Sequence, residues 1–461
     1  MRTLCTVLLA AGAVLLCLSS AAGADTFTVT KTADTADGSC DADCSLREAI
    51  LDAVAGPPSG PHTIVVGAGE YQNTGSDFIL GIGDQLTITG AGARTTTLRE
   101  VMGGDGRVFL VEDDARLTLS GVTVTGTTSA ACVLVLDDAS LTASQVTFSG
   151  NSGLAGGGAI ANSGGSVTLT ESALSANSAA SKGAGVYQSG ADPSLSLTNV
   201  TISGNGAPSG AGLAVDTGTA TLRNVTLAGN SGSRDLLTAA GATSIASSVV
   251  GGCDGAPVSL GFNLDAGASC GLAAAGDLSS LDPKLGAPAD NGGPTNTMAL
   301  DSTSPARDAG GPCPPPATDQ RGLARPGGGA CDIGAYEAQV SPLPPVGTRL
   351  TRLRVKRRSP KALRVSFRLD SADRVRFELM RARPGRRRAG QGCVASRRAR
   401  PGARRCTRWV TLRSFSRPGA KGSNAFRMRA RGLQIGRHML KATPREGSAV
   451  FRRFRVKAFR P

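Results

Sequence analysis

The sequence predicts an all-β protein built from two parts, a solenoid of stacked parallel strands and a smaller, strongly basic β domain. Three observations support this prediction. A strand-like phrase recurs at nearly constant spacing, glycine-rich turns recur between its copies, and the net charge changes sign near residue 341. These observations determine the fold far more firmly than the function.

The recurring phrase alternates apolar with small polar residues and closes on asparagine. Its copies end at Asn151, Asn177, Asn205 and Asn230, at spacings of 26, 28 and 25 residues, and an earlier copy without asparagine spans Leu117–Thr127. A period of 20–50 residues is typical of solenoids, propellers and arrays, and alternation at period two indicates strands. A propeller blade needs about 40–50 residues, so a parallel β-helix fits this period better.

Glycine-rich turns precede the phrases, with Gly158, Gly185 and Gly212 spaced 27 residues apart. Glycine adopts positive φ angles at corners without steric cost. We expect the closing asparagines to adopt left-handed backbone conformations and to hydrogen-bond one another along the stack. We expect one buried column of inward residues: Leu195, Leu197, Val200 and Ile202, followed by Ala220, Leu222, Val225 and Leu227.

The segment before the repeats predicts an exported chain with a capped first coil. Residues 1–24 combine a basic start, an apolar run and the small-residue site Ala22-Gly-Ala24, as in a secretory signal peptide. Ser45-Leu-Arg-Glu48 is a capping box that opens a helix, and a terminal coil of a solenoid needs a cover. We expect the first irregular coils to contain residues 64–66 and 86–88. No later stretch is apolar enough to span a membrane.

Nine cysteines follow the signal segment, and eight of them form close pairs in the sequence. Export would place them in an oxidising compartment, where disulfides form. We expect Cys132, which is left over, to lie in a strand as a small hydrophobic residue. The expected disulfides join Cys40 to Cys44, Cys253 to Cys270, Cys313 to Cys331, and Cys393 to Cys406.

The charge of the chain divides it in two. Residues 25–341 hold 13 Lys/Arg against 31 Asp/Glu, a net charge of −18, whereas residues 342–461 hold 36 against 4, a net charge of +32. The Pro-rich segment 341–347 between them predicts a semi-rigid linker. An acidic solenoid is therefore expected to precede a basic domain over 348–461.

Three stretches resemble known families. Cys44-Ser-Leu-Arg-Glu-Ala-Ile50 resembles the N-terminal signature (CSLREA) of bacterial secreted β-helix proteins of the polymorphic outer-membrane type. The repeats of 117–230 look like right-handed parallel β-helix repeats of the pectin-lyase-like fold. The resemblance implies a right-handed β-helix over 25–255 and an anchor-like C-terminal end over 256–340. Four motifs of that end resemble the choice-of-anchor Q domain of bacterial surface proteins: Asn291–Leu300, Ser304–Gly310, Asp319–Gly322 and Cys331–Glu337.

The basic tail resembles, more loosely, β-sandwich modules of secreted bacterial proteins. Segments such as Val375–Leu379 and Phe451–Val456 alternate at period two with arginine outward. Arginines crowd a predicted loop bracketed by Cys393 and Cys406, where we expect binding of a wall polymer or acidic glycan, with an unliganded solvated surface as the alternative. The lack of interleaved aromatic residues disfavours nucleic acid. The expected polyanion-binding residues are Arg386, Arg387, Arg388, Arg397, Arg398, Arg400, Arg404 and Arg405.

The solenoid offers little material for catalysis. The acidic pairs Asp113-Asp114 and Asp137-Asp138 are 24 residues apart, so they should stack at one turn. We expect turn-forming roles for all four, with a Ca²⁺ site as the weaker alternative and no other cofactor. His62 is the only solenoid histidine and is expected in a loop, which leaves almost nothing for a Ser-His-Asp arrangement. In the anchor-like end we expect a tightly turned end-cap, with Asp308, Asp319 and Asp332 paired to Arg307, Arg321 and Arg325.

These patterns favour an exported, monomeric, non-catalytic protein of the cell surface, used for adhesion or envelope association, whose basic tail holds an anionic polymer. The alternative is a polysaccharide lyase or glycoside hydrolase that acts on an extracellular glycan, because the fold alone does not name a reaction. Stacked carboxylates with Ca²⁺ beside an arginine would favour the enzyme. A smooth face coated with Ser, Thr and Asn would favour the adhesin.

Overall fold

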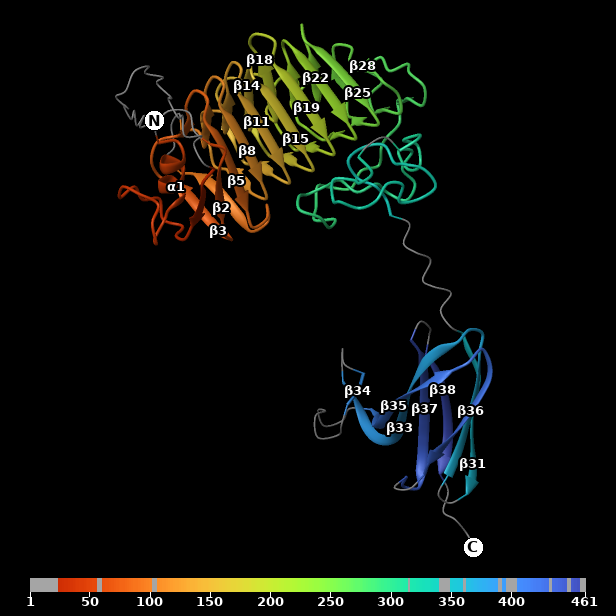
Figure 1. The fold of residues 1–461 in the computed structure, drawn as a ribbon. Coiled ribbons are helices and arrows are strands. Elements are labelled where there is room, and N and C mark those ends of the chain that lie inside the picture. Colours follow the sequence, from red (N-terminus) through yellow and green to blue (C-terminus); the bar gives the residue numbers. More distant parts are fainter. Residues whose placement is uncertain are drawn as a thin grey trace, which may run out of the picture. The chain divides into compact units, whose positions relative to one another are not determined.

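The chain divides into two compact units, Met1–Gln339 (the solenoid unit) and Val340–Pro461 (the basic unit) (Figure 1). The predicted signal segment, apart from Ala24, and the predicted linker 341–347 lie outside the described residues. The computed structural model describes residues 24–55, 60–101, 106–313, 316–339, 349–359, 362–388, 392–394, 404–430, 433–445 and 449–456.

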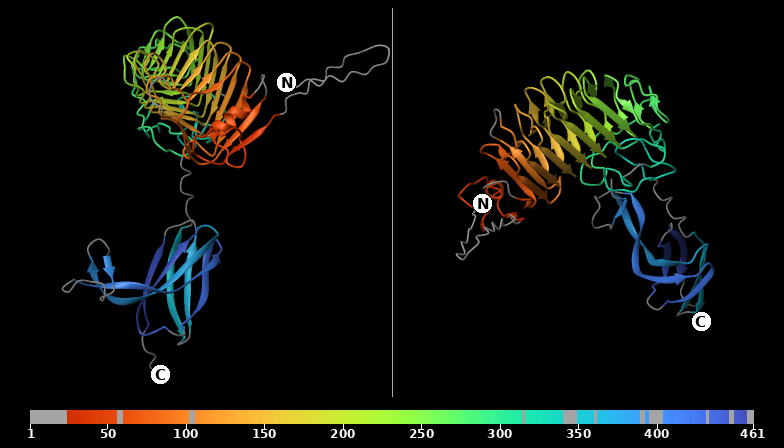
Figure 2. Two further views of the ribbon diagram at one scale, coloured as in Figure 1. Left: turned by 90° about the vertical axis from the view of Figure 1, so that its left-hand side faces the viewer. Right: turned by 45° about the horizontal axis from the view of Figure 1, so that its top comes forward.

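The solenoid unit is a parallel β-solenoid of three sheets, in which each central coil contributes a strand to each sheet and the terminal coils contribute fewer (Figures 1 and 2). Sheet A contains β1 (Thr26–Val29), β2 (His62–Val66), β5 (Gln85–Gly90), β8 (Arg116–Ser120), β11 (Ser140–Ser144), β15 (Ser166–Thr170), β19 (Ser194–Thr198), β22 (Thr219–Arg223), β25 (Ala242–Ala246) and β28 (Val258–Ser259). Sheet B contains β3 (Gly69–Asn73), β6 (Thr96–Glu100), β9 (Thr123–Thr125), β12 (Thr147–Ser149), β16 (Ala173–Ser175), β20 (Thr201–Ser203), β23 (Thr226–Leu227), β26 (Val249–Val250), β29 (Leu264–Asp265) and β30 (Leu278–Ser279). Sheet C contains β4 (Phe78–Leu80), β7 (Phe109–Val111), β10 (Val133–Val135), β14 (Ile160–Ser163), β18 (Val186–Ser189), β21 (Leu213–Val215), β24 (Leu236–Thr238) and β27 (Cys253–Asp254), and a small fourth sheet joins β13 (Ser152–Gly153) to β17 (Ser178–Ala179).

The period-two pattern of the sequence produces these strands because one face of each is buried. All eight predicted inward residues are at most 3% exposed and belong to one continuous core. In-register pairing of Leu195 with Val167 and with Ala220 places like positions above one another. The buried column predicted from the repeats is therefore confirmed.

The closing asparagines form a buried ladder. Asn151 donates from Nδ2 to Oδ1 of Asn177 at 3.0 Å, Asn177 to Asn205 at 2.8 Å, and Asn205 to Asn230 at 2.9 Å. The expected hydrogen bonding is confirmed, but the expected left-handed backbone of these asparagines is wrong. Positive φ occurs instead at the residue just before each one: Gly150 (66°), Ala176 (54°), Gly204 (67°) and Gly229 (73°).

The N-terminal cap is the helix α1 (Leu46–Ala53), and its apolar face joins the core of the first coils. Both halves of the predicted capping box are present, since Glu48 N donates to Ser45 Oγ and Ser45 N donates to the Glu48 carboxylate. The sequence did not reveal β1, which precedes the helix and pairs with β2, so sheet A starts one strand earlier than expected.

The segment after the last coil is placed differently from the predicted end-cap. Residues 286–338, called the return segment, fold back along sheet B instead of covering only the terminal coil (Figure 2). Thr318 O accepts from Asn199 Nδ2 at 2.8 Å, and Asp290 pairs with Arg94 at 3.0 Å. The return segment thereby covers part of the outer face of sheet B.

Charged side chains of the return segment form ion pairs and hydrogen bonds that stabilise the turns of this segment. Asp319 pairs with Arg321 at 2.6 Å as predicted, but the partner of Arg325 is Glu337, at 2.8 Å and fully buried. Asp308 and Asp332 accept backbone N–H groups instead of the predicted arginine partners. Burial raises the pKa of Asp332 to about 6. These residues are structural.

The basic unit consists of two antiparallel sheets that share one hydrophobic core. In that core Phe377 contacts Phe367 at 5.5 Å and Phe426 at 4.9 Å between ring centres. The three-stranded sheet contains β31 (Leu350–Ser359), β32 (Ala362–Leu369) and β36 (Gly422–Arg429). The five-stranded sheet contains β33 (Asp373–Arg388), β34 (Gly392–Val394), β35 (Arg405–Gly419), β37 (Gly436–Pro444) and β38 (Val450–Val456).

All four predicted disulfides are present. Cys132 is a free cysteine and lies just before β10, close to the strand position that the sequence predicted. Complete burial raises the pKa of its thiol. Within the described ranges, no helix is both long and apolar enough to cross a membrane.

Candidate binding surfaces

The outer face of sheet A carries an unbroken row of hydroxyl side chains. In each of nine consecutive strands, the residue at the same register position is Ser or Thr, and every one is exposed or half-buried. Neighbouring coils lie about 4.8 Å apart. The row is Thr26, Thr63, Thr87, Thr118, Thr142, Thr168, Ser196, Thr221 and Ser244.

A second hydroxyl row lies parallel to the first, two residues further along each strand and thus about 7 Å away. It shares the outward face because side chains two residues apart in a strand point the same way. Ser120 Oγ donates to Thr89 Oγ1 at 3.2 Å within this row. The two rows carry no charge themselves, and the charged side chains beside them on this face of sheet A are Arg116 and Arg223. The second row comprises Thr89, Ser120, Ser144, Thr170 and Thr198.

The acidic pairs lie at the turns from sheet C to sheet A. Asp114 and Asp138 have φ angles of 62° and 56°, and both pairs are exposed. The equivalent position in the preceding coil is Gly83, with φ 82°. Aspartate tolerates this left-handed conformation, so backbone geometry accounts for these residues. Among the described residues, no group of three or more His, Cys, Asp or Glu is arranged to hold a metal ion.

Three chemically active side chains from two consecutive coils meet beside sheet C. Asp216 Oδ2 accepts from Lys182 Nζ at 2.7 Å and from Tyr187 Oη at 2.9 Å. The hydrogen bond to Asp216 raises the pKa of Lys182, while burial, followed by that carboxylate, raises the pKa of Tyr187. This cluster could not be predicted from the sequence, because its members are spaced irregularly and two of them lie outside the sheet strands.

His62 is not the loop residue that the sequence predicted. It opens β2, is 6% exposed, and accepts from the backbone N–H of Asp25 through Nδ1 at 3.2 Å. Apolar residues that follow it in β2 alternate toward the core, and His62 lies at a position that faces the core as well. His62 therefore has a structural partner and a buried position.

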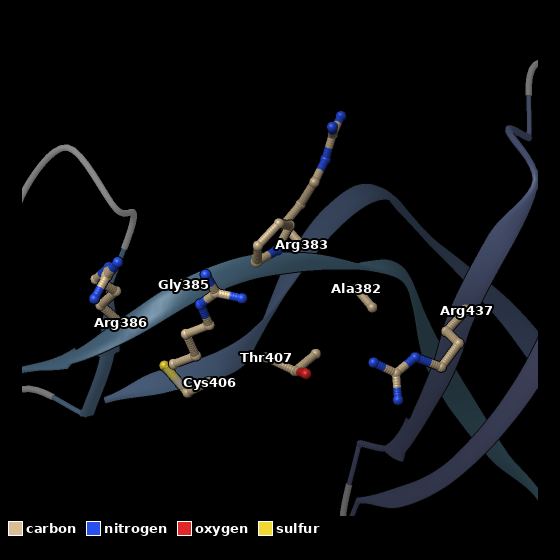
Figure 3. A pocket seen from close by; sticks show the side chains of 9 residues that line it. Ala382, Arg383, Gly385, Arg386, Cys406, Thr407 and Arg437 are labelled. Carbon is tan, nitrogen blue, oxygen red and sulfur yellow. The ribbon is translucent and has the colours of Figure 1, made fainter. Parts of the chain in front are cut away.

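The basic unit carries a pocket of about 640 Å³ on the five-stranded sheet (Figure 3). Small residues, including Ala382 and Thr407, lie between the arginine side chains of Arg386 and Arg437. The described residues that line it include no carboxylate. The lining residues come from three strands: Ala382, Arg383, Pro384, Gly385 and Arg386 from β33, Arg405, Cys406 and Thr407 from β35, and Arg437 from β37.

A second pocket of about 520 Å³ lies on the same sheet. Glu378, the one acid among its described lining residues, is bonded to Lys441 at 2.7 Å. Lys441, together with Arg376, lowers the pKa of that carboxyl. Arginine and lysine thus outnumber acids in both pockets. The second pocket is lined by Arg374, Arg376, Glu378, Ser416, Lys441, Thr443, Pro444 and Arg445.

The predicted polyanion-binding arginines are not all in a loop. Arg386, Arg387 and Arg388 end β33, and Arg405 begins β35 directly after the exposed Arg404. The structure brings Arg386 and Arg405 into the first pocket, together with Arg383 and Arg437, which the sequence argument missed. Arg397, Arg398 and Arg400 lie outside the described residues.

A scan of the sequence against protein-family models matched no family, and a search of curated proteins returned no match. The motifs at 44–50 and within 291–337 therefore remain resemblances.

Proposed function

We propose that this protein is an exported, non-catalytic, adhesin-like β-helix protein of the cell surface. The observation that carries the proposal is the pair of hydroxyl rows on the outer face of sheet A. Regularly spaced, uncharged Ser and Thr side chains can exchange many weak hydrogen bonds with a glycan without cleaving it. Within this proposal, residues 44–50, the repeats and the return segment belong to the CSLREA, pectin-lyase-like and choice-of-anchor Q families.

The basic unit is assigned to retention on an anionic polymer of the envelope. Its net charge of +32 over residues 342–461 attracts polyanions regardless of their sequence. The arginine-lined pockets add directional donors, because a guanidinium binds carboxylate, sulfate and phosphate groups in bidentate fashion. The solenoid would then present its hydroxyl face while the basic unit holds the envelope.

A polysaccharide lyase is the second candidate, and the Lys182–Tyr187–Asp216 cluster is the observation in its favour. A general base working near neutral pH needs a pKa close to that pH. The pKa values of Lys182 and Tyr187 move upward instead, away from neutrality. The cluster therefore supports an ion-paired contact between coils better than it supports proton abstraction.

The test compares binding and turnover on the full mature chain. A triple variant, Thr118→Ala, Thr142→Ala and Thr168→Ala, removes three neighbouring hydroxyls of the first row. The control, Thr147→Ala with Ser149→Ala, removes hydroxyls from the outer face of sheet B. We expect the triple variant alone to lose binding to uncharged glycans on an array, because the basic unit still holds acidic ones. Release of unsaturated or reducing ends from any glycan, abolished by Asp216→Asn, would overturn the proposal in favour of the lyase.

A further inference from the structure

We propose that the outer face of the five-stranded sheet is a two-pocket site for a linear acidic glycan, and that one polymer chain spans both pockets. This inference rests on the proposed role of the basic unit in binding polyanions. It names the face, the ligand class and a minimum ligand length.

Strand alternation places both pockets on one face. On β33, Val375, Phe377 and Leu379 point into the core, so the residues between them point outward. The even-numbered series continues from Arg376 in the second pocket to Arg386 in the first. The odd-numbered residues of β37 behave in the same way, since Lys441 and Thr443 line one pocket and Arg437 the other.

A β-bulge keeps β35 consistent with this arrangement. The pairing of β33 with β35 shifts between Leu379 and Met380, so that Leu412 has no partner on β33. One extra residue reverses the alternation of a strand. Ser416 before the bulge and Thr407 after it can therefore line pockets on the same face despite their opposite parity. Three neighbouring strands thus present a single continuous surface.

Two arginines of the first pocket, Arg405 and Arg437, have no carboxylate partner among the described residues. Among the described residues, no ion pair involves Arg405 or Arg437, and both are exposed. The described residues that line this pocket include no acid. An oligoanion entering it would find uncompensated guanidinium groups that are already positioned on strands.

The surface between the pockets favours a glycan over a nucleic acid. Arg453 lies over the Trp409 ring at 5.8 Å, so this ring already has a cationic partner. Phe451, 55% exposed and paired with Lys441, offers one isolated ring. Single-stranded nucleic acids are held by successive aromatic platforms, whereas a single ring between charged pockets suits a sugar chain.

The two pockets set a length requirement. Arg376 and Arg386 are ten residues apart on one strand, a span of about 30 Å. A glycan shorter than this fills one pocket, whereas a longer chain binds the second pocket in an intramolecular step and gains avidity. Affinity should therefore rise abruptly once the chain exceeds the span, instead of rising in proportion to its charge.

The experiment uses size-fractionated heparin as the probe and measures Kd by fluorescence anisotropy on the full mature chain at constant ionic strength. Arg405→Ala with Arg437→Ala disrupts the first pocket, and Arg376→Ala with Arg445→Ala disrupts the second. Arg364→Ala with Arg368→Ala, two exposed positions on β32 of the other sheet, removes the same charge as a control. Circular dichroism checks that each variant folds.

We expect either pocket variant to weaken binding of long fractions about tenfold or more, and to abolish the abrupt rise with length. The control should change the Kd of long fractions by less than about twofold. Equal weakening by all three variants would overturn the two-pocket site while leaving polyanion binding intact. Tighter binding of single-stranded DNA than of heparin of matched charge would overturn the glycan assignment. Failure of the parent chain to bind any polyanion would overturn the proposed function as well.

Discussion

Asn177 and Asn205 lie on consecutive coils, and the side-chain amide of one donates to the side-chain carbonyl of the next at 2.8 Å. Asn177 is 1% exposed and also donates to Phe148 O at 3.1 Å. Asn177 thus bonds to buried polar groups of both neighbouring coils, since its Oδ1 also accepts from Asn151 Nδ2 at 3.0 Å. The ladder connects the coils by directional bonds at a corner where the apolar core ends.

Asn177→Ala should destabilise the solenoid unit by about 1–3 kcal/mol, because it removes the Oδ1 atom that accepts from the buried backbone N–H and the Nδ2 of Asn151. Thermal and denaturant unfolding followed by circular dichroism measure the change. Thr142→Ala, which removes an exposed hydroxyl of sheet A, serves as the matched control and should change stability little. Equal effects of the two substitutions would contradict a special role for the ladder.

The capping box predicts a loss of stability in acid. The hydrogen bond from Ser45 N, together with those from Thr35 and Asp37, lowers the pKa of Glu48 to about 2. Because the folded-state pKa lies below the unfolded value, Glu48 stabilises the fold above pH about 4.5, and this contribution is lost as the pH falls toward 2.

Glu48→Gln should therefore lower the melting temperature at pH 7 and flatten its decline between pH about 4.5 and 2. Melting temperatures of the parent and the variant over this range measure the effect. Asp25→Asn changes an exposed residue that directly precedes β1. This control should keep the parental dependence of the melting temperature on pH. Parallel curves for the parent and Glu48→Gln would contradict the assignment.

The buried pair Arg325–Glu337 should hold the return segment in place. Both side chains are 0% exposed, and Glu337 also accepts from the backbone N–H groups of Gly327 and Asp332. Arg325→Met leaves an uncompensated buried carboxylate, so we expect a loss of about 3–5 kcal/mol. Arg94→Met breaks the exposed pair with Asp290 and should cost less than about 1 kcal/mol.

Limited proteolysis distinguishes local detachment from global unfolding in the Arg325→Met variant. We expect early cleavage within residues 286–338 while the coils stay protected, because the described part of this segment contributes no strand to the sheets of the coils. Cleavage spread evenly over the solenoid unit would show that the pair stabilises the coils themselves.

Local and periodic signals account for what the sequence could predict. The inward column, the asparagine ladder, the capping box and the disulfides each depend on residues close in sequence or one coil apart. The return segment does not, since Asn199 and Thr318 are 119 residues apart and follow no repeat. The Lys182–Asp216 contact was missed because turn lengths decide which of these side chains meet. The first pocket was missed because the bulge at Leu412 decides which residues of β35 face it.

The turn position of Asp138 gives a prediction that separates backbone geometry from ion binding. Its φ of 56° lies in the left-handed region, which asparagine tolerates and which costs alanine about 1–2 kcal/mol. Asp138→Asn should therefore keep the parental melting temperature, whereas Asp138→Ala should lower it. The same pair of substitutions at Asp114, with φ 62°, should behave alike.

Removing all four charges of the two acidic pairs by Asp→Asn should relieve like-charge repulsion between stacked turns, so the melting temperature should stay level or rise slightly. Differential scanning fluorimetry with and without Ca²⁺ provides the measurement, and Ca²⁺ should shift neither the parent nor the Asn variant. A rise in melting temperature that requires both Ca²⁺ and the aspartates would show that these turns bind the ion.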